Sequence, residues 1–161
     1  MTTQEYNNCV RQYSDAVFRF VLKNLSNRTD AEDVVQNTFE KLWRKKDQVE
    51  ADKSKSYLFS IAYHDMIDLI RKNKFVKAYQ DLPEQAGGEF TKQMEAKEIM
   101  DLGLETLSPI QKSLILLKDY EGYSYEEMAE MTELTLSQVK VYLFRARKKM
   151  QLAINQLNKA V

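Results

Sequence analysis

Residues 124–150 read SYEEMAEMTELTLSQVKVYLFRARKKM, and this stretch carries two helix-start patterns eleven residues apart. Ser124 followed by Glu127 is the pattern of a helix N-terminus, and the same pattern recurs at Thr135 and Gln138, after the short turn TEL. Two helices joined by a three-residue turn form a helix-turn-helix. The stretch therefore predicts a helix-turn-helix whose second helix begins just after Thr135.

The second helix of this stretch has an apolar side and a polar, basic side. Its apolar residues recur at helical spacing and are Val139, Leu143, Ala146, Met150, Ala153, Ile154 and Leu157. Successive residues are 100° apart around a helix, so polar and basic residues fall on the opposite side. The residues that we expect to contact duplex DNA there are Ser137, Gln138, Lys140, Val141, Arg145 and Lys148. Phe144 also points away from the apolar stripe, and we expect it either to dock on another protein or, as the favoured alternative, to cover the preceding helix.

The net charge of the chain is zero, but the charge is uneven along its length. Lysine and arginine outnumber aspartate and glutamate by 14 to 11 in residues 1–80 and by 6 to 0 in residues 134–161, whereas residues 81–133 hold 4 bases and 13 acids. A tail of six bases without an acid suits contact with phosphate, and such binding weakens steeply as salt rises. Taken alone, this helix could also bind an acidic protein or simply face solvent.

Upstream of the helix-turn-helix, the sequence predicts two more helices. An acidic helix is expected around residues 95–107. Ser108, Pro109 and Gln111 then give a strong start signal, in which serine caps the helix, proline takes the first helical position and glutamine closes a capping box. This helix should end near Gly122, because glycine readily adopts the positive φ of a C-terminal cap.

A stretch without helical periodicity precedes these helices. Residues 78–89 hold one of the two prolines and two of the four glycines of the chain. We interpret residues 78–92 as a flexible linker. The linker divides the chain into an N-terminal domain, residues 1–77, and a C-terminal domain, residues 93–161.

Three helices are expected before the linker. Apolar residues recur at helical spacing from Tyr6 to Val21, in a helix that ends near residues 25–27. A second helix follows directly, with Thr29 and Glu32 as its capping box. The charged run 44–55 then breaks the apolar stripe, and a third helix runs from residue 56 into a basic end at residues 71–74, where cations suit the helix dipole.

Length and composition limit the architecture. A chain of 161 residues, 43% apolar and 30% charged, can bury one or two modest cores. Two prolines and four glycines leave long uninterrupted stretches at helical spacing. We therefore predict an all-α protein with two small helical domains joined by a flexible linker, the C-terminal one a helix-turn-helix.

The sequence lacks the features of an enzyme, a metal site or a cofactor site. His64 and Cys9 are the only residues of their kinds. There is no P-loop, no histidine pair at metal spacing and no CxxC motif. We therefore expect no catalytic residue, no metal and no cofactor. Asp30, Glu32 and Asp33 are better explained as negative charge at a helix N-terminus.

The sequence also predicts a cytoplasmic protein. It starts without a basic flank followed by an apolar run, and no window approaches eighteen consecutive apolar residues, so we expect no membrane insertion. A single cysteine excludes an internal disulfide framework and fits a reducing compartment. The spacing of Cys9 on the first helix suggests ordinary packing.

Separate segments of the chain resemble the extracytoplasmic-function (ECF) group of bacterial sigma factors. Residues 30–43, DAEDVVQNTFEKLW, are similar to the polymerase-binding helix of that family. Residues 57–72 resemble the promoter-melting helix that follows, and residues 107–109 with 139–147 resemble the DNA-binding module. The resemblance covers nearly the whole chain in the family's order. It implies a sigma factor that binds core RNA polymerase, recognises promoter elements and directs transcription initiation by helping to melt the promoter.

The resemblance also implies roles for residues of the first domain. The second helix would dock on the coiled coil of the polymerase's largest subunit, with Trp43 packed inside. The residues expected to contact the polymerase are Asp33, Gln36, Asn37 and Phe39. A mobile loop, residues 47–55, and the aromatic start of the third helix would hold an unstacked base. The residues expected to contact the melted promoter are Lys53, Lys55, Ser56, Tyr57, His64, Arg71, Lys72 and Lys74.

The chain departs from the family pattern at several positions. Asn37 replaces a usual acid, and Glu133 replaces a usual glycine in the turn. Val141 and Tyr142 replace small polar and basic residues, so the promoter sequence is not predictable. His64 stands where the family often has a base-contacting asparagine, so we expect it to touch promoter DNA; a purely structural histidine is the alternative.

Other classes of protein explain the sequence less well. An enzyme would need a convergent set of catalytic residues that the sequence does not show. An ordinary helix-turn-helix repressor or response-regulator output domain would bind duplex DNA without polymerase, and residues 1–80 argue against it. A helical adaptor that binds only proteins leaves the cation-rich last helix unexplained. We expect core RNA polymerase, promoter DNA and an anti-sigma factor as partners.

Overall fold

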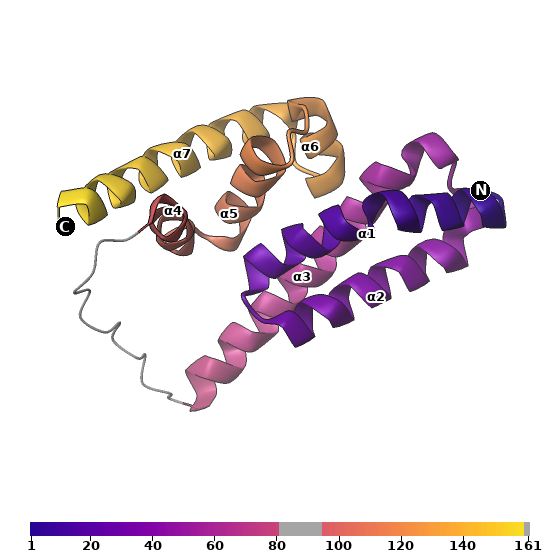
Figure 1. Ribbon diagram of the computed structural model, residues 1–161, viewed down its shortest axis with the longest axis horizontal. Coiled ribbons are helices and arrows are strands. Elements are labelled where there is room, and N and C mark those ends of the chain that lie inside the picture. Colours follow the sequence, from indigo (N-terminus) through magenta and orange to yellow (C-terminus); the bar gives the residue numbers. More distant parts are fainter. Residues whose placement is uncertain (81–94, 160–161) are drawn as a thin grey trace.

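The structure of the protein is a computed structural model that describes residues 1–80 and 95–159, with side chains described for residues 1–74 and 95–159. Every regular element in these ranges is a helix (Figure 1). The all-α prediction is therefore confirmed. Within these ranges, no helix combines the length and the apolar composition that crossing a membrane requires.

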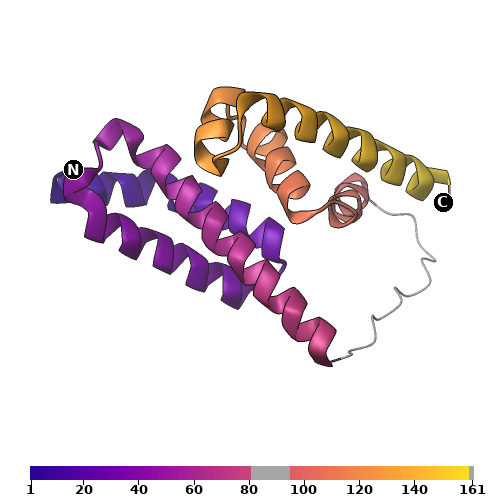
Figure 2. The same cartoon turned by 180° about the vertical axis from the view of Figure 1, so that it is seen from behind.

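The N-terminal module is a bundle of three helices, α1 (Thr3–Leu25), α2 (Arg28–Lys45) and α3 (Ser54–Gln80) (Figure 1). Each of the three packs against the other two. Their facing sides bury a common set of apolar residues, which includes Val17, Phe20, Val21, Ala31, Leu42, Leu58, Phe59, Ala62 and Met66. The end of α3 extends past α1 and α2 (Figure 2). It reaches three residues into the predicted linker, whose remaining residues, 81–92, lie outside the described part of the chain.

The connection from α1 to α2 is shorter than the sequence suggested. Ser26 caps α1 in the left-handed conformation, with φ of 56°, and its N–H donates to the Leu22 carbonyl. Asn27 then caps α2, because its side chain accepts from the Asp30 N–H at 3.0 Å. The predicted capping box at Thr29 and Glu32 was therefore wrong: an asparagine two residues earlier supplies the acceptor that the helix start needs.

The charged segment between α2 and α3 was predicted to be a mobile loop, but it forms two 3₁₀ turns, Lys46–Gln48 and Ala51–Lys53. Val49 between them is buried. The Met1 ammonium donates to the carbonyls of Lys46 and Val49, at 2.6 and 3.0 Å. These contacts fix the path by which the chain enters α3.

The C-terminal module contains α4 (Ala96–Glu105), α5 (Pro109–Ile115), a π-helical segment (Leu116–Tyr120), α6 (Tyr125–Thr132) and α7 (Leu136–Lys159). Helices α4, α5 and α6 all pack on α7. Gly103 lets α4 approach closely, because a Cβ there would lie 3.1 Å from Ile154 Cγ1. The predicted helix-turn-helix is thus formed by α6 and α7.

The caps of the C-terminal module agree with the sequence prediction. Ser108 and Gln111 make both bonds of a capping box at the start of α5. Thr135 and Gln138 do the same at the start of α7, at 2.9 and 3.1 Å. Gly122 has the expected positive φ, 77°. In this module, local signals of this kind placed the starts of α5, α6 and α7 correctly.

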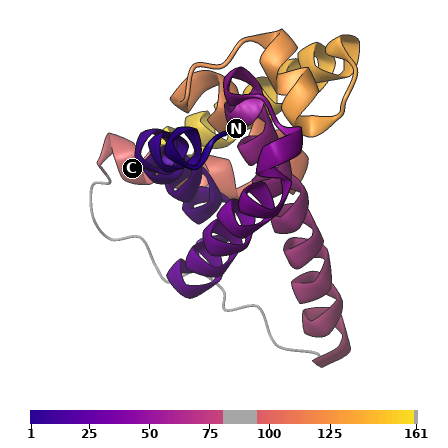
Figure 3. The same ribbon diagram turned by 90° about the vertical axis from the view of Figure 1, so that its right-hand side faces the viewer.

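The two modules are in contact. Helix α6 packs against α3, and α5 packs against α1 and α3 (Figures 1 and 3). Three neighbouring aromatic rings cross the contact. The centroid of the Phe59 ring lies 5.7 Å from that of Phe20 and 5.0 Å from that of Tyr123. A buried hydrogen-bonding contact accompanies it, with Ser113 Oγ 3.1 Å from Asn24 Oδ1. One continuous core therefore joins the modules.

Candidate functional site

The outer side of α7 presents the residues predicted to contact duplex DNA. All six are exposed, and we call them the α7 face: Ser137, Gln138, Lys140, Val141, Arg145 and Lys148. The opposite side of the helix is buried through Val139, Leu143, Ala146 and Met150. Arg147 lies off the face, where its Nε donates to Asp119 Oδ2 at 3.1 Å. The face thus combines small polar side chains in the first turns with cations further along.

Phe144 lies exposed beside the α7 face, although we expected another helix or protein to cover it. Its side chain is 68% exposed, and Val141 is 44% exposed. The prediction that Phe144 covers the preceding helix was wrong, because the helices that pack on α7 lie on the side of its buried stripe. An exposed phenylalanine among cations offers apolar contact to a base edge such as the thymine methyl group.

The 3₁₀ turn Ala51–Lys53 and the first eleven residues of α3 hold the first group of residues predicted to contact melted promoter DNA. We call Lys53, Lys55, Ser56, Tyr57 and His64 the single-strand site. Lys53 is exposed, whereas the other four are partly buried. Lys55 Nζ lies 4.2 Å from the ring centroid of Tyr123 and 3.8 Å from Glu127 Oε2, both in the C-terminal module.

His64 also faces the C-terminal module. Its Nδ1 lies 2.7 Å from the Ser60 carbonyl oxygen, one helical turn earlier, and Nε2 lies 3.4 Å from Glu133 Oε2. Glu133 is the turn residue that replaces glycine, and it adopts φ of 60°. A non-glycine residue in this conformation costs free energy.

The second group on α3 lies at the opposite end of the helix. Arg71, Lys72 and Lys74 are exposed there. The structure therefore splits the predicted promoter-melting residues into two groups. In the first, Lys55 and His64 contact acids of the C-terminal module. In the second, all three cations are exposed, and Lys74 lines a pocket together with Leu107 and Lys112 of that module.

The exposed side of α2 carries Trp43, which was predicted to pack inside. Asp33, Gln36 and Asn37 are exposed as expected, but Phe39 is only 9% exposed and Trp43 is 44% exposed. Phe39 lies on the core side of α2, and its contact with the polymerase stays a prediction. The Trp43 ring instead packs edge-on against Tyr6, at 4.9 Å, and falls on the same side of α2 as Gln36.

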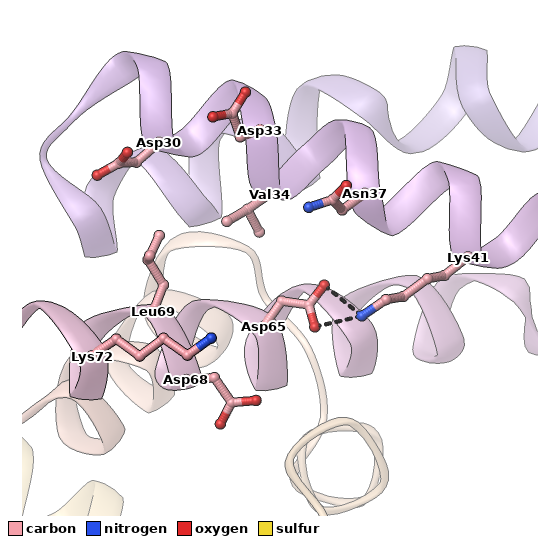
Figure 4. Close-up of a pocket in the computed structure, with 9 residues that line it drawn as sticks. All are labelled: Asp30, Asp33, Val34, Asn37, Lys41, Asp65, Asp68, Leu69 and Lys72. Atoms are coloured by element: carbon pink, nitrogen blue, oxygen red, sulfur yellow. Dashed lines mark hydrogen bonds and ion pairs between the residues drawn. The ribbon is translucent and has the colours of Figure 1, made fainter.

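A groove of about 310 Å³ lies between α2 and α3 (Figure 4). Its α2 wall includes Asp33 and Asn37, and its α3 wall includes Lys72. Lys41 bridges the two walls, with Nζ 2.7 Å from Asp65 Oδ1. Residues that the sequence assigned to polymerase contact and to DNA contact are therefore neighbours across one groove.

Models of known protein families match both modules of the chain. Sigma-70 region 2 matches residues 9–76, and Sigma-70 region 4 matches residues 97–150. The chain belongs to the ECF group of sigma-70 factors. This family consists of regulatory DNA-binding proteins, and the ECF sigma factor acts in promoter recognition and transcription initiation.

Two relatives match this sigma factor over most of both chains. The ferric citrate uptake sigma factor FecI of Escherichia coli (strain K12) is 29% identical over 136 residues, which cover 79% of this chain and 78% of FecI. The ECF RNA polymerase sigma factor SigM of Bacillus subtilis (strain 168) is 26% identical over 151 residues, 91% of this chain and 93% of SigM.

A solved structure supports the fold of the ECF sigma factor. The sigma factor RpoE from Bartonella quintana, in a co-crystal structure with the anti-sigma factor NepR, superposes with a TM-score of 0.77 and 24% identity, over 95% of this chain and 98% of RpoE. At this identity the likeness concerns the fold alone. The predicted architecture of two helical units, the second a helix-turn-helix, is thus confirmed.

Proposed function

We propose that this ECF sigma factor uses three surfaces. Two lie on the N-terminal module and serve polymerase docking and promoter melting, and one lies on the C-terminal module and binds the upstream promoter element. The domain division 1–77, 78–92 and 93–161 is part of this proposal. The observation that carries it is the α7 face: five cations lie between Lys140 and Lys149, and the six predicted contact residues are all exposed on a helix whose other side is buried. Such a helix fits the major groove of the upstream promoter element.

Polymerase docking is assigned to the exposed side of α2. Asp33, Gln36 and Asn37 supply polar contacts, and Trp43 supplies a large exposed aromatic side chain of the type that dominates binding energy at protein interfaces. Phe39 supports this surface from the core side. Loss of Trp43 should therefore weaken polymerase binding at least as much as loss of any one of the polar residues.

Promoter melting is assigned to α3. The single-strand site at its start combines cations with an aromatic side chain, which suits the backbone and one unstacked base. Arg71, Lys72 and Lys74, at its other end, are suited to phosphates further along. Stacking contributes about 1–3 kcal/mol per base, enough to bias opening once the polymerase supplies the rest.

Membership of the family also supports proposals about where the chain acts and how it is regulated. We infer that the chain acts in the cytoplasm, has no catalytic activity of its own, and is held inactive by an anti-sigma factor. The support for the last point is the fold neighbour RpoE, which is solved in complex with the anti-sigma factor NepR. A partner of this kind would have to cover the exposed side of α2 with Asp33 and Trp43, the single-strand site or the α7 face.

Reconstituted transcription tests the proposal. The purified chain is mixed with sigma-free core polymerase and genomic promoter fragments, and specific transcripts are expected. Arg145→Ala should weaken binding of the upstream element and leave polymerase association intact, whereas Asp33→Ala and Trp43→Ala should do the reverse. Absence of transcripts from every fragment would contradict the function, and equal loss of both activities in each variant would contradict the division of labour.

A further inference from the structure

The only tryptophan of the chain lies exposed at the end of α2. Trp43 continues a row of exposed side chains formed by Gln36 and Glu40, which lie about two turns and one turn earlier on the helix. Gln36 Nε2 lies 3.5 Å from Glu40 Oε1 along this row. An indole without neighbours would sample several rotamers on such a surface. The contacts around Trp43 therefore decide which orientation of the ring a partner meets.

Tyr6 of α1 contacts α2 at two points that are one helical turn apart. Its hydroxyl donates to the Phe39 carbonyl at 3.0 Å. Its ring meets the Trp43 ring edge-on, with 4.9 Å between the centroids and 66° between the planes, a favourable geometry for an aromatic pair. The start of α1 and the end of α2 lie at the same end of the three-helix bundle (Figures 1 and 2). One side chain of α1 thus joins the backbone of α2 to the exposed indole.

Tyr6 is itself held in place by the first turn of α1. Its N–H donates to the Thr2 carbonyl at 3.0 Å, and Thr2 and Glu5 make both bonds of a capping box. The Tyr6 side chain is partly buried against the core. Burial raises the pKa of its phenol, which therefore stays protonated and remains a hydrogen-bond donor. Tyr6 is thus a fixed support for the indole.

A cation on α2 completes the surroundings of the indole. Lys46 Nζ lies 5.1 Å from the centroid of the Trp43 ring and 3.2 Å from Asp47 Oδ1. A cation over an indole ring is attracted by the negative face of the ring. The backbone of Lys46 is also fixed, because its N–H donates to the Trp43 carbonyl. Trp43 therefore has one partner on α1 and another at the end of its own helix.

We propose that Tyr6 is a positioning residue for polymerase docking, which together with Lys46 holds the Trp43 indole in the orientation that the polymerase binds. This inference rests on the proposed docking role of Trp43. It extends the docking surface to α1, a helix that carries none of the predicted polymerase contacts. Binding immobilises a side chain at an entropic cost, and a side chain that is already held avoids this cost. Loss of the support should therefore weaken binding although the indole is retained.

The affinity of the full chain for sigma-free core polymerase, measured by biolayer interferometry, tests the inference. Tyr6→Leu removes the ring and should weaken binding about threefold to tenfold, the range expected when one side chain is freed. Tyr6→Phe keeps the ring and loses only the hydroxyl, so it should weaken binding less. Tyr13→Leu is the matched control, because Tyr13 is also a partly buried tyrosine of α1 but forms no aromatic pair with Trp43 in the described part of the chain. It should change the affinity by less than about twofold.

A double-mutant cycle shows whether Tyr6 acts through the indole. In the Trp43→Ala background, Tyr6→Leu should cause no further loss of polymerase affinity, because the side chain that Tyr6 positions is absent. An additional loss as large as in the wild-type background would mean that Tyr6 acts independently of Trp43, and would refute the inference.

A second comparison tests the cation over the ring. Lys46→Gln removes it, and Lys45→Gln removes the same charge from the exposed neighbour in the sequence. Polymerase affinity should fall about twofold to fivefold more in Lys46→Gln than in Lys45→Gln. Equal losses would show that only the charge matters and would overturn the part assigned to Lys46.

Intrinsic fluorescence gives a readout that a purely structural role of Tyr6 would not change, because Trp43 is the only tryptophan. In the free chain, Tyr6→Leu should increase both the quenching by acrylamide and the amplitude of fast anisotropy decay. Tyr13→Leu should leave both as in the wild type. Weaker polymerase binding by Tyr6→Leu without a change in the mobility of the indole would contradict the positioning role.

The outcomes separate this inference from the proposed function. If Trp43→Ala weakens polymerase binding but Tyr6→Leu does not, the docking surface stands and the positioning role is refuted. If Trp43→Ala leaves polymerase binding unchanged, the docking role of Trp43 fails and the inference fails with it. Urea denaturation gives the folded fraction of each variant, and affinities are compared per folded molecule. Should Tyr6→Leu not fold, Tyr6→Phe and Lys46→Gln provide the same test.

Discussion

The α7 face and the single-strand site are both assigned to promoter DNA, yet the structure leaves them in opposite conditions. On α7, Arg145 and Lys148 project into solvent beside an exposed Phe144. At the start of α3, Lys55 faces a carboxylate of the other module and Phe59 is fully buried. Duplex reading therefore needs no rearrangement, whereas capture of a single strand depends on how the modules are placed.

The largest expected effect concerns the stability of the fold, which we compare for one aromatic residue beside each surface, Phe59 and Phe144. Phe59→Ala should lower the free energy of unfolding by about 3–5 kcal/mol, because Phe59 is buried between Phe20 and Tyr123 and its loss leaves a cavity. Phe144→Ala should change it by no more than about 0.5 kcal/mol. Urea denaturation followed by circular dichroism measures both. Similar losses in the two variants would mean that the two aromatic side chains do not differ in burial as described.

Salt dependence is the next largest effect and concerns the α7 face. Four exposed cations on α7, Lys140, Arg145, Lys148 and Lys149, can each displace a counterion from duplex DNA. Raising the salt from about 50 to about 200 mM should then weaken duplex binding by roughly a hundredfold. Fluorescence anisotropy with an upstream promoter fragment measures this. A slope near zero would show that the α7 face does not contact phosphate.

Two substitutions on α7 separate the effect of side-chain position on duplex binding from the effect of charge alone. Arg145→Ala should weaken duplex binding by about tenfold or more at constant salt, because Arg145 lies on the α7 face. Arg147→Ala removes the same charge from a side chain that is paired with Asp119 off the face, and should weaken binding by less than about threefold. The same anisotropy titration measures both variants. Equal losses would favour a general electrostatic effect over specific placement.

The smallest expected effect concerns the turn that faces the single-strand site. Glu133 and Ser26 both have positive φ, 60° and 56°. Glycine at either position relieves the left-handed backbone and should raise the unfolding free energy by about 0.5 kcal/mol, or the melting temperature by about 1–2 °C. Glu133→Gly also loses the contact with His64, which is favourable when the imidazole is protonated, so at acidic pH it should gain less than Ser26→Gly. A larger gain for Glu133→Gly would count against a stabilising contact between the modules.

The features that sequence predicted correctly depend on neighbouring residues. Capping boxes at Ser108 and Thr135 involve residues three apart, and the stripe from Val139 to Met150 follows from helical spacing alone. The exposed α7 face is the other side of that stripe. For this reason the helix-turn-helix and its exposed cations could be predicted from the sequence without tertiary information.

The features that sequence did not predict depend on distant residues. Trp43 was assigned the wrong burial, because hydrophobicity alone does not show that Tyr6 supports Trp43 at the surface. Phe144 was expected to be covered, and its exposure depends on where α6 lies. The contact of Lys55 with Glu127 joins residues of different modules, and no local pattern in the sequence encodes it.

The π-helical segment Leu116–Tyr120 has a consequence for how the chain tolerates changes in length. A π turn holds one residue more than an α turn, here with the Glu121 N–H donating to the Leu116 carbonyl five residues earlier, at 3.0 Å. Deleting one residue there would leave a regular α-helix but rotate everything after it by about 100°. Tyr123 would then turn away from Phe59, so a deletion that preserves helicity should uncouple the two halves of the molecule.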